Sequence, residues 1–217
     1  MRNLILLLSI AFFISCSSVP KKYLTDDDIC HYNDPFFKIT EEEIAFNNKK
    51  YDSILSIKGA IYIEDENHLI EIQKDLIGKT DKETKLTKWI YYYSKGNIKS
   101  VSFSMRNSSS SYIGKETYYD QQGNITKVID YEKGYKICWA EAIEIVKQIA
   151  KKDIKKYNIT GFNLSHTNLN EYPKEKPVWA ISLDGKEEYE IKDTKVYWID
   201  GVTGKYVKTT KIITEHE

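Results

Sequence analysis

The middle of the chain alternates between apolar and polar side chains at the spacing of strands. Across 53–137, runs rich in β-branched and aromatic residues are separated by turn-forming segments such as DEN at 65–67. In the run VSFSM (101–105) apolar residues alternate with serines, which predicts a strand with one buried face. The expected strands are 53–58, 60–63, 68–72, 87–93 and 101–106.

A short repeat underlies this pattern. The segment GNIKSV at 96–101 recurs as GNITKV at 123–128, each copy follows a tyrosine pair, and 62–72 resembles a degenerate earlier copy. Each unit has the composition of a strand, a Gly-Asn turn and a return strand. Because one hairpin cannot bury its own apolar face, we expect several to lie side by side as an antiparallel meander.

The period of the pattern changes between 138 and 157. Apolar residues there share one helical face, and charged residues such as Glu141, Glu144 and Lys147 take the other. This predicts one helix of about five turns. The apolar face consists of Trp139, Ala142, Ile143, Val146, Ile149, Ala150, Ile154 and Tyr157.

Three further strands are expected after this helix, at 178–183, 195–199 and 205–213, with a short strand or bend at 161–164. We expect the helix to cover the resulting sheet and to bury Trp179 and Trp198. The predicted fold class is therefore α+β, an antiparallel meander followed by a helix packed on a small antiparallel sheet.

The first residues predict export. Residues 4–14 form an apolar run that only Ser9 interrupts, and these 11 residues are too few to span a bilayer. The end of the run, Phe13-Ile14-Ser15-Cys16, resembles a bacterial lipobox, which implies that Cys16 carries lipid such as palmitate. An ordinary signal peptide with an incidental cysteine is the alternative.

The chain then divides into a signal peptide (1–15), a lipid-anchored linker (16–35), a hairpin repeat region (36–137) and a C-terminal α+β domain (138–217). The resemblance places the protein on a bacterial cell envelope. Ser17 after the cysteine resembles the sorting signal of enterobacterial lipoproteins, which implies the outer membrane, facing the periplasm.

The charge balance argues against one class of partner. Without Arg2 the chain keeps 31 basic side chains against 32 acidic ones, a net charge of −1. A nucleic-acid-binding protein carries a basic excess, so no nucleic acid is expected as a partner.

Two cysteines remain once Cys16 serves as the anchor. In an exported protein Cys30 and Cys138 can form one disulfide, or both can stay unpaired thiols. Cys30 beside His31 also resembles part of a metal or nucleophile site, but the two further ligands of a closed zinc site are missing nearby.

The segment YWIDGVTGKYV (197–207) concentrates the features of a ligand loop. A Walker loop needs four residues between its glycines, whereas two separate Gly201 from Gly204. One aspartate, Asp200, cannot supply the six or more oxygens of a calcium site, so no metal is expected. A hairpin turn fits: the Asp200 carboxylate bonds the backbone of the next residues, and both glycines permit a positive φ.

The same segment carries a family resemblance. A helix, then KPVWAISL, then KVYWIDGVTGKYV is similar to the PepSY domain over 138–211. The resemblance implies a non-catalytic module that inhibits a peptidase or binds an envelope partner. The segment YYDQQGNITKVIDY (118–131) resembles the hairpin repeats of MORN-like antitoxin proteins, which implies architecture only. The matching PepSY positions are Trp179, Tyr197, Ile199, Asp200, Thr203 and Gly204.

No stretch of the sequence predicts catalysis. The four histidines are scattered, and Gly-x-Ser-x-Gly, His-Glu-x-x-His and Cys-x-x-Cys motifs are all absent from the sequence. The acidic run at 41–43 is expected to be a solvated face. We therefore expect no catalytic residues and no cofactor.

A binding function remains. We expect the protein to bind or inhibit a protein partner, with Tyr206 and Lys208 as partner-binding residues on an exposed sheet edge. The alternatives are an immunity or antitoxin-like protein that neutralises a toxin, and a glycan-binding module that uses the tyrosines at 91–93 and 118–119. In a sheet at most half of those tyrosines face outward.

Overall fold

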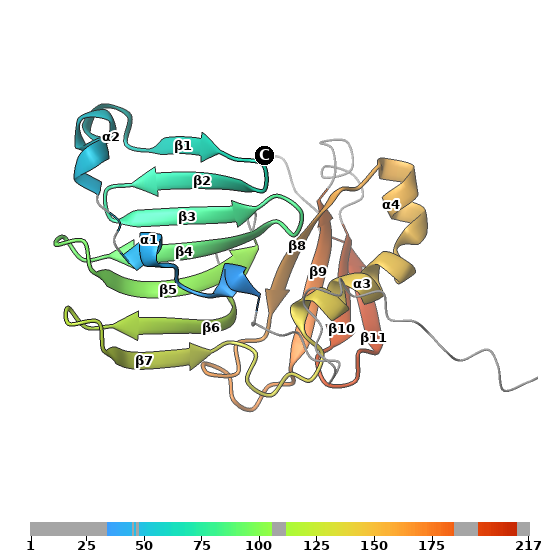
Figure 1. Ribbon diagram of the computed structural model, residues 1–217. Coiled ribbons are helices and arrows are strands. Elements are labelled where there is room, and N and C mark those ends of the chain that lie inside the picture. Colours follow the sequence, from blue (N-terminus) through green and yellow to red (C-terminus); the bar gives the residue numbers. More distant parts are fainter. Residues whose placement is uncertain (1–33, 45, 47, 106–111, 185–194, 212–217) are drawn as a thin grey trace, which may run out of the picture.

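The computed structural model describes residues 34–44, 46, 48–105, 112–184 and 195–211. Two antiparallel sheets lie side by side, one of seven strands and one of four, and two helices lie over the smaller sheet (Figure 1). The α+β class is therefore confirmed. Within the described residues no helix is both long and apolar enough to cross a membrane. The predicted signal peptide and nearly all of the predicted linker lie outside them.

The larger sheet is a meander in which every strand pairs with its neighbours in the chain. The expectation of side-by-side hairpins is thus confirmed. The strands are β1 (Ile61–Glu64), β2 (His68–Gln73), β3 (Leu76–Asp81), β4 (Leu86–Tyr92), β5 (Ile98–Met105), β6 (Tyr112–Tyr119) and β7 (Ile125–Asp130).

The sequence repeat is also a repeat of geometry. In the β4–β5 turn the Tyr93 amide donates to the Asn97 carbonyl, and in the β6–β7 turn the Asp120 amide donates to that of Asn124. Gly96 and Gly123 have φ values of 90° and 86°. These angles are readily available only to glycine, which explains why both copies keep it at this position.

Two expectations for the strands are wrong. Residues 53–58 belong to a helix, α2 (Asp52–Lys58), which ends where the Gly59 amide donates to the Leu55 carbonyl. The strand β3 was not expected, because Gly78 interrupts its pattern. Glycine is needed there: a Cβ at Gly78 would lie 2.5 Å from Cζ3 of Trp89, whose ring covers this position.

The expectation of one buried face on β5 is wrong too. The apolar residues at 101, 103 and 105 are buried, and so are Ser100, Ser102 and Ser104. The second face is closed by hydroxyl groups and by Trp89, whose indole N–H donates to Ser104 Oγ at 2.8 Å. Serine is small and can be satisfied locally, so its presence does not report exposure.

The N-terminal segment lies across the front of this sheet in Figure 1. It contains η2 (Pro35–Phe37), α1 (Glu41–Ile44) and η3 (Asn48–Tyr51). The ring of Phe37 lies 4.9 Å from that of Phe103. Tyr92 donates its hydroxyl to the Glu43 carbonyl at 2.9 Å.

A buried ion pair fixes the same segment. Lys88 is 1% exposed, and its ammonium lies 2.5 Å from Glu43 Oε1 and 2.9 Å from the Lys38 carbonyl. Burial lowers the pKa of Lys88, and Glu43 opposes that shift. The expectation of a solvated acidic run at 41–43 is therefore wrong for Glu43, because a buried cation needs a counter-charge.

The smaller sheet has the order β11-β10-β9-β8. β7 ends at Asp130 and the first covering helix begins at Trp139, yet one cluster of buried side chains includes residues of both sheets. The elements of this part are α3 (Trp139–Ile149), α4 (Lys151–Tyr157), β8 (Gly161–His166), β9 (Val178–Asp184), β10 (Lys195–Asp200) and β11 (Tyr206–Lys211).

The expected single helix is wrong in detail. The chain turns at Ala150, with φ −87° and ψ 10°, so two shorter helices form. As a result Ala150 is buried while Ile149 is 43% exposed. Glu144, expected in solvent, is buried and pairs with Lys147.

Of the two tryptophans expected under the helix, only one lies there. Trp179 is fully buried and its indole N–H donates to the Ile137 carbonyl. Trp198 lies on the opposite face, half-buried, because neighbouring residues on a strand point to opposite sides.

Candidate functional site

The turn between β10 and β11 is organised by one carboxylate. Asp200 Oδ1 accepts hydrogen bonds from the amides of Val202 and Thr203, at 3.0 and 2.8 Å, and from Thr203 Oγ1 at 3.0 Å. The backbone amides of Thr203 and Val202 hold the pKa of Asp200 below its usual value. Asp200 Oδ1 is therefore engaged in hydrogen bonds within the turn.

The two glycines of the turn have different roles. Gly204 has a φ of 68°, as expected. A positive φ at Gly201 was also expected, and this is wrong. Gly201 lies against Tyr135, where a Cβ would be 2.4 Å from the ring atom Cδ1. Its amide donates to the Pro177 carbonyl, so this glycine docks the turn against the rest of the chain.

The strand that follows the turn forms an open edge. Among the described strands β11 pairs only with β10. Tyr206 and Val207 are 48% and 52% exposed. Lys208 is exposed as well, with its ammonium 5.0 Å from the centre of the Trp198 ring. Residues 205–211 contain three lysines and no acidic residue. The structure thus brings the two predicted partner-binding residues together on one cationic strand.

The structure describes Cys138 but not the other cysteines of the chain. Cys138, buried at the start of α3, is disulfide-bonded. Cys16 and Cys30, the other cysteines of the chain, lie outside the described residues. The pairing of Cys30 with Cys138 and the lipidation of Cys16 therefore stay predictions.

The tyrosines of the repeat divide between the two faces of the large sheet. Tyr92 is buried beneath the N-terminal segment, whereas Tyr91 and Tyr118 are half-buried on the other face. Glu116 is buried near them and accepts the hydroxyl of Tyr131 at 2.7 Å. Burial, with Glu116 adding to it, raises the pKa of Tyr118 to about 12. One face therefore carries a cluster of neutral tyrosines.

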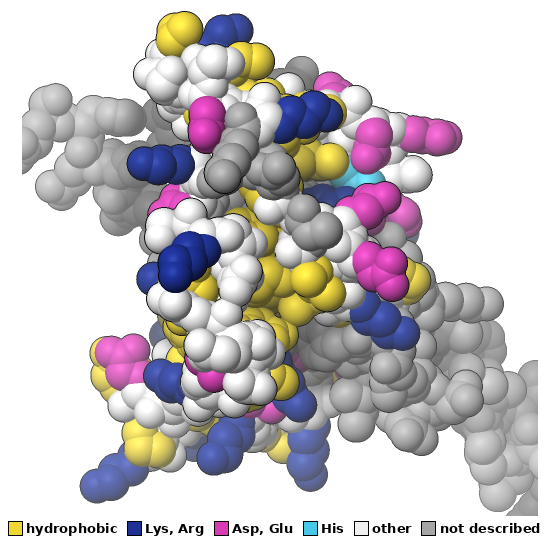
Figure 2. Space-filling view, turned by 60° about the vertical axis from the view of Figure 1, so that its left-hand side comes forward, with side chains coloured by type: hydrophobic (Ala, Val, Ile, Leu, Met, Phe, Trp, Pro, Cys, Tyr) yellow, Lys and Arg dark blue, Asp and Glu magenta, His cyan; other side chains and the backbone are white. Residues whose placement is uncertain are grey.

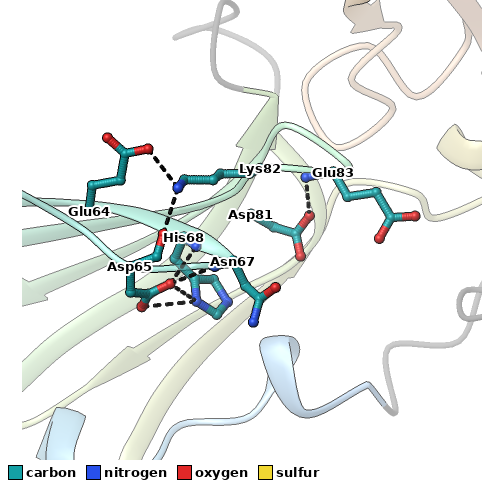
Figure 3. A network of polar contacts seen from close by, with 7 residues as sticks. All are labelled: Glu64, Asp65, Asn67, His68, Asp81, Lys82 and Glu83. Carbon is teal, nitrogen blue, oxygen red and sulfur yellow. Dashed lines mark hydrogen bonds and ion pairs between the residues drawn. The ribbon is translucent and has the colours of Figure 1, made fainter.

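The polar network in Figure 3 lies at the turns that join β1 to β2 and β3 to β4. Asp65 Oδ1 accepts the amides of Asn67 and His68, at 2.8 and 2.6 Å, and these bonds hold its pKa below the usual value. Lys82 bridges the turns, bonding the Asp65 carbonyl at 2.5 Å and Glu64 at 2.6 Å.

Asp81 shapes the second of these turns in the same way. Its Oδ1 accepts the amides of Glu83 and Thr84, at 3.0 and 2.7 Å. These acidic groups therefore stabilise loops. In the part of the chain that the structure describes, no group of three His, Cys, Asp or Glu side chains is arranged to hold a metal ion.

A cleft of about 410 Å³ opens beside the β3–β4 turn, a volume typical of small-molecule sites. It lies between that turn, the end of β5, the two helices and the start of β8. The floor is apolar and the mouth is charged. The floor residues are Met105, Trp139, Ala140, Ile143, Ile154, Ile159 and Phe162, and the charged residues are Glu83, Lys85, Glu144, Lys147 and Lys151.

Figure 2 shows that hydrophobic side chains also gather on the side that carries α2 and the hairpin tips, with charged groups around them. Exposed apolar residues of the elements nearby include Ile44, Ile57 and Ile125, at 59%, 84% and 62%. Exposed apolar groups of this kind are typical of surfaces that contact other molecules.

Two features were missed by sequence reasoning. The cleft is built from separate segments at 83–85, 105 and 139–162, and no local pattern predicts it. The Lys88–Glu43 pair had one available signal, a lysine inside the run 86–92, whose other residues are apolar except for Thr87.

The chain matches no protein-family model, no curated protein and no solved structure.

Proposed function

We propose that this protein is a lipid-anchored, non-catalytic protein of the bacterial envelope that binds an extended segment of a protein partner along β11. The observation that carries the proposal is the open, cationic edge of β11. An edge strand presents unpaired backbone groups to which another extended chain can add. Exposed Tyr206 and Val207 give such a chain apolar contacts.

The chemistry of β11 defines the partner further. The lysines at 205, 208 and 211 favour an acidic segment, because complementary charge steers and orients association. The resemblance of this part of the chain to the PepSY domain suggests a peptidase as the partner, whose inhibition would follow from occupation of its surface. A toxin neutralised by an immunity-like protein would satisfy the same chemistry.

Site-specific photo-crosslinking tests the proposal. A photoreactive amino acid replaces Tyr206 in cells that carry the protein, and Tyr172 serves as the matched control because it is 54% exposed on the β8–β9 loop, outside β11. We expect one defined crosslinked protein from position 206 and none from position 172. Equal labelling from both positions, or none from 206, would contradict binding along β11.

Charge reversal sharpens the test. Lys208→Glu should reduce crosslinking and make the residual binding less sensitive to salt, since exposed charges are screened at high ionic strength. Lys174→Glu, an exposed lysine near the control position, should leave binding unchanged.

The envelope location has its own test. If Cys16 carries the lipid, Cys16→Ala should abolish metabolic palmitate labelling and release the protein from the membrane fraction. Unchanged labelling and fractionation would contradict the anchor.

Glycan binding is the second candidate, and the tyrosine cluster on the face of the large sheet opposite the N-terminal segment favours it. Tyrosine rings and hydroxyls both suit sugars, through apolar stacking and hydrogen bonds. Tyr118→Ala would then reduce binding to purified envelope polysaccharide without changing crosslinking from position 206. No saturable polysaccharide binding by the native protein would exclude this candidate.

A further inference from the structure

The cleft beside the β3–β4 turn is separate from the surface used in the proposed function. It is lined by the start of β8, whereas β11 forms the opposite edge of the small sheet. One face of helix α3 is buried in the core, and another lines the cleft. Ala142 and Val146 are fully buried, while Ala140, Ile143 and Lys147 line the cleft.

The least exposed residues that line the cleft are apolar. Met105 and Trp139, 2% and 3% exposed, come from the large sheet and from α3, and Phe162 comes from β8. Such a surface favours an apolar ligand, because removing apolar area from water contributes roughly 25 cal/mol per Å². The apolar part of a ligand therefore fits the floor.

The mouth of the cleft carries an excess of positive charge. Glu144 is paired with Lys147, whose ammonium also lies 5.6 Å from the centre of the Phe162 ring. Beyond this pair, the charged residues of the lining are Lys85, Lys151 and one acidic residue, Glu83. Both lysines are exposed at the surface. The mouth therefore complements a single anionic group.

We propose that this cleft binds an apolar molecule that carries one anionic group, of the size and class of a medium-chain fatty acid. The hydrocarbon part lies on the floor between Met105, Ile143 and Phe162. The carboxylate lies at the mouth, between Lys85 and Lys151. Binding is non-covalent and involves no reaction.

Methionine NMR tests this directly. The chain has two methionines, Met1 and Met105, so labelling of the methionine methyl carbons gives Met105 its own signal in the cleft floor. Laurate is titrated below its micelle concentration, with dodecanol and dodecyltrimethylammonium as neutral and cationic probes of equal chain length. We expect a saturable shift of the Met105 signal, with the tightest binding for laurate and the weakest for the cation.

A matched pair of double variants tests the role of the charges. Lys85→Glu with Lys151→Glu reverses the mouth, and Lys95→Glu with Lys99→Glu makes the same net change on the exposed β4–β5 hairpin. The mouth variant should bind laurate at least about threefold more weakly, the scale of an exposed charge contact, and should lose the preference over dodecanol. The hairpin variant should behave as the native protein.

Three results would overturn the proposal. They are a Met105 signal that laurate does not shift saturably, equal affinity for the three amphiphiles, and equal weakening by the two double variants. None of these readouts involves β11, so each would leave the crosslinking result at Tyr206 unaffected.

Discussion

The strand β5 near the centre of the large sheet and the strand β11 at the edge of the small sheet differ sharply in burial. In β5 all residues from Ser100 to Met105 are buried, whereas in β11 every residue except Thr210 is exposed. The meander buries the side chains on both faces of this strand. The small sheet uses one face for its helices and leaves a whole strand available. This difference identifies β11 as the strand whose backbone N–H and C=O groups can pair with a partner.

The β6–β7 and β10–β11 turns also differ in how closely they are packed. Gly123, in the β6–β7 turn, has no other atom within 4 Å of an added Cβ. Gly204, in the β10–β11 turn, has Ile145 Cδ1 at 3.2 Å. The first turn projects into open space, and the second is packed against α3. The exposed edge of β11 is therefore held by a turn whose Gly204 packs against α3.

The largest expected effect concerns the disulfide of Cys138, at the start of α3. If Cys138 pairs with Cys30, the disulfide closes a loop of about 108 residues, and its loss should cost roughly 4–5 kcal/mol in the chain-entropy estimate. We expect Cys30→Ser and Cys138→Ser to lower the free energy of unfolding equally in urea titrations. Two free thiols in unreduced, denatured protein from the envelope would contradict the pairing.

The next effect concerns the core of the large sheet alone. Glu43→Gln leaves the ammonium of Lys88 buried without its counter-charge, and breaking such a pair costs about 3–5 kcal/mol. Urea unfolding followed by tryptophan fluorescence measures the change. The control is Glu42→Gln, an exposed neighbour whose change should be within about 0.5 kcal/mol.

The same pair has a pH signature. Because burial lowers the pKa of Lys88, the folded state holds its proton less tightly than the unfolded chain does. Stability should therefore rise as the pH increases from the lowered pKa of the folded state towards the ordinary pKa of lysine. In Glu43→Gln this rise should begin at a lower pH. An identical pH dependence in both proteins would contradict the role of Glu43.

A smaller effect separates the two turns. Gly123→Val forces a β-branched residue to a φ of 86°, which costs about 1–2 kcal/mol. Gly204→Val adds overpacking against Ile145 to the same strain, so the total should be larger by about 1–3 kcal/mol. Thermal unfolding of both variants provides the comparison. Equal losses would mean that the packing around Gly204 is irrelevant.

The sequence predicted the class of the fold and most strands because apolar alternation and turn residues act locally. It failed where contacts across the chain decide. Gly78 breaks the pattern of β3 because the Trp89 ring occupies the space that a side chain would need. The serines of β5 are buried although only Ser104 bonds the Trp89 indole, and Ser102 Oγ has no hydrogen-bond partner among the described residues. The exposure of Tyr206 was predictable from its place on the last strand. The cleft was not, since distant segments form it.

The smallest effect tests the turn of the small sheet. Asp200→Ala removes hydrogen bonds at the surface and should cost about 1 kcal/mol or less. Since its amide partners lower the pKa of Asp200, this contribution is present above the ordinary aspartate range and is lost as the pH falls through the lowered value. Calcium should leave the melting temperature of the native protein unchanged. A rise with calcium that Asp200→Ala abolishes would contradict a purely structural turn.

The central claim is that a partner adds a strand along β11, and hydrogen exchange measures this at the backbone itself. The amides of 206–211 are compared in the free protein and in the complex with the partner captured from position 206, with the β6–β7 turn at 120–124 as the reference. Strand addition predicts slowed exchange within 206–211 and an unchanged reference turn. A bound partner that leaves the exchange of 206–211 unchanged would contradict the account.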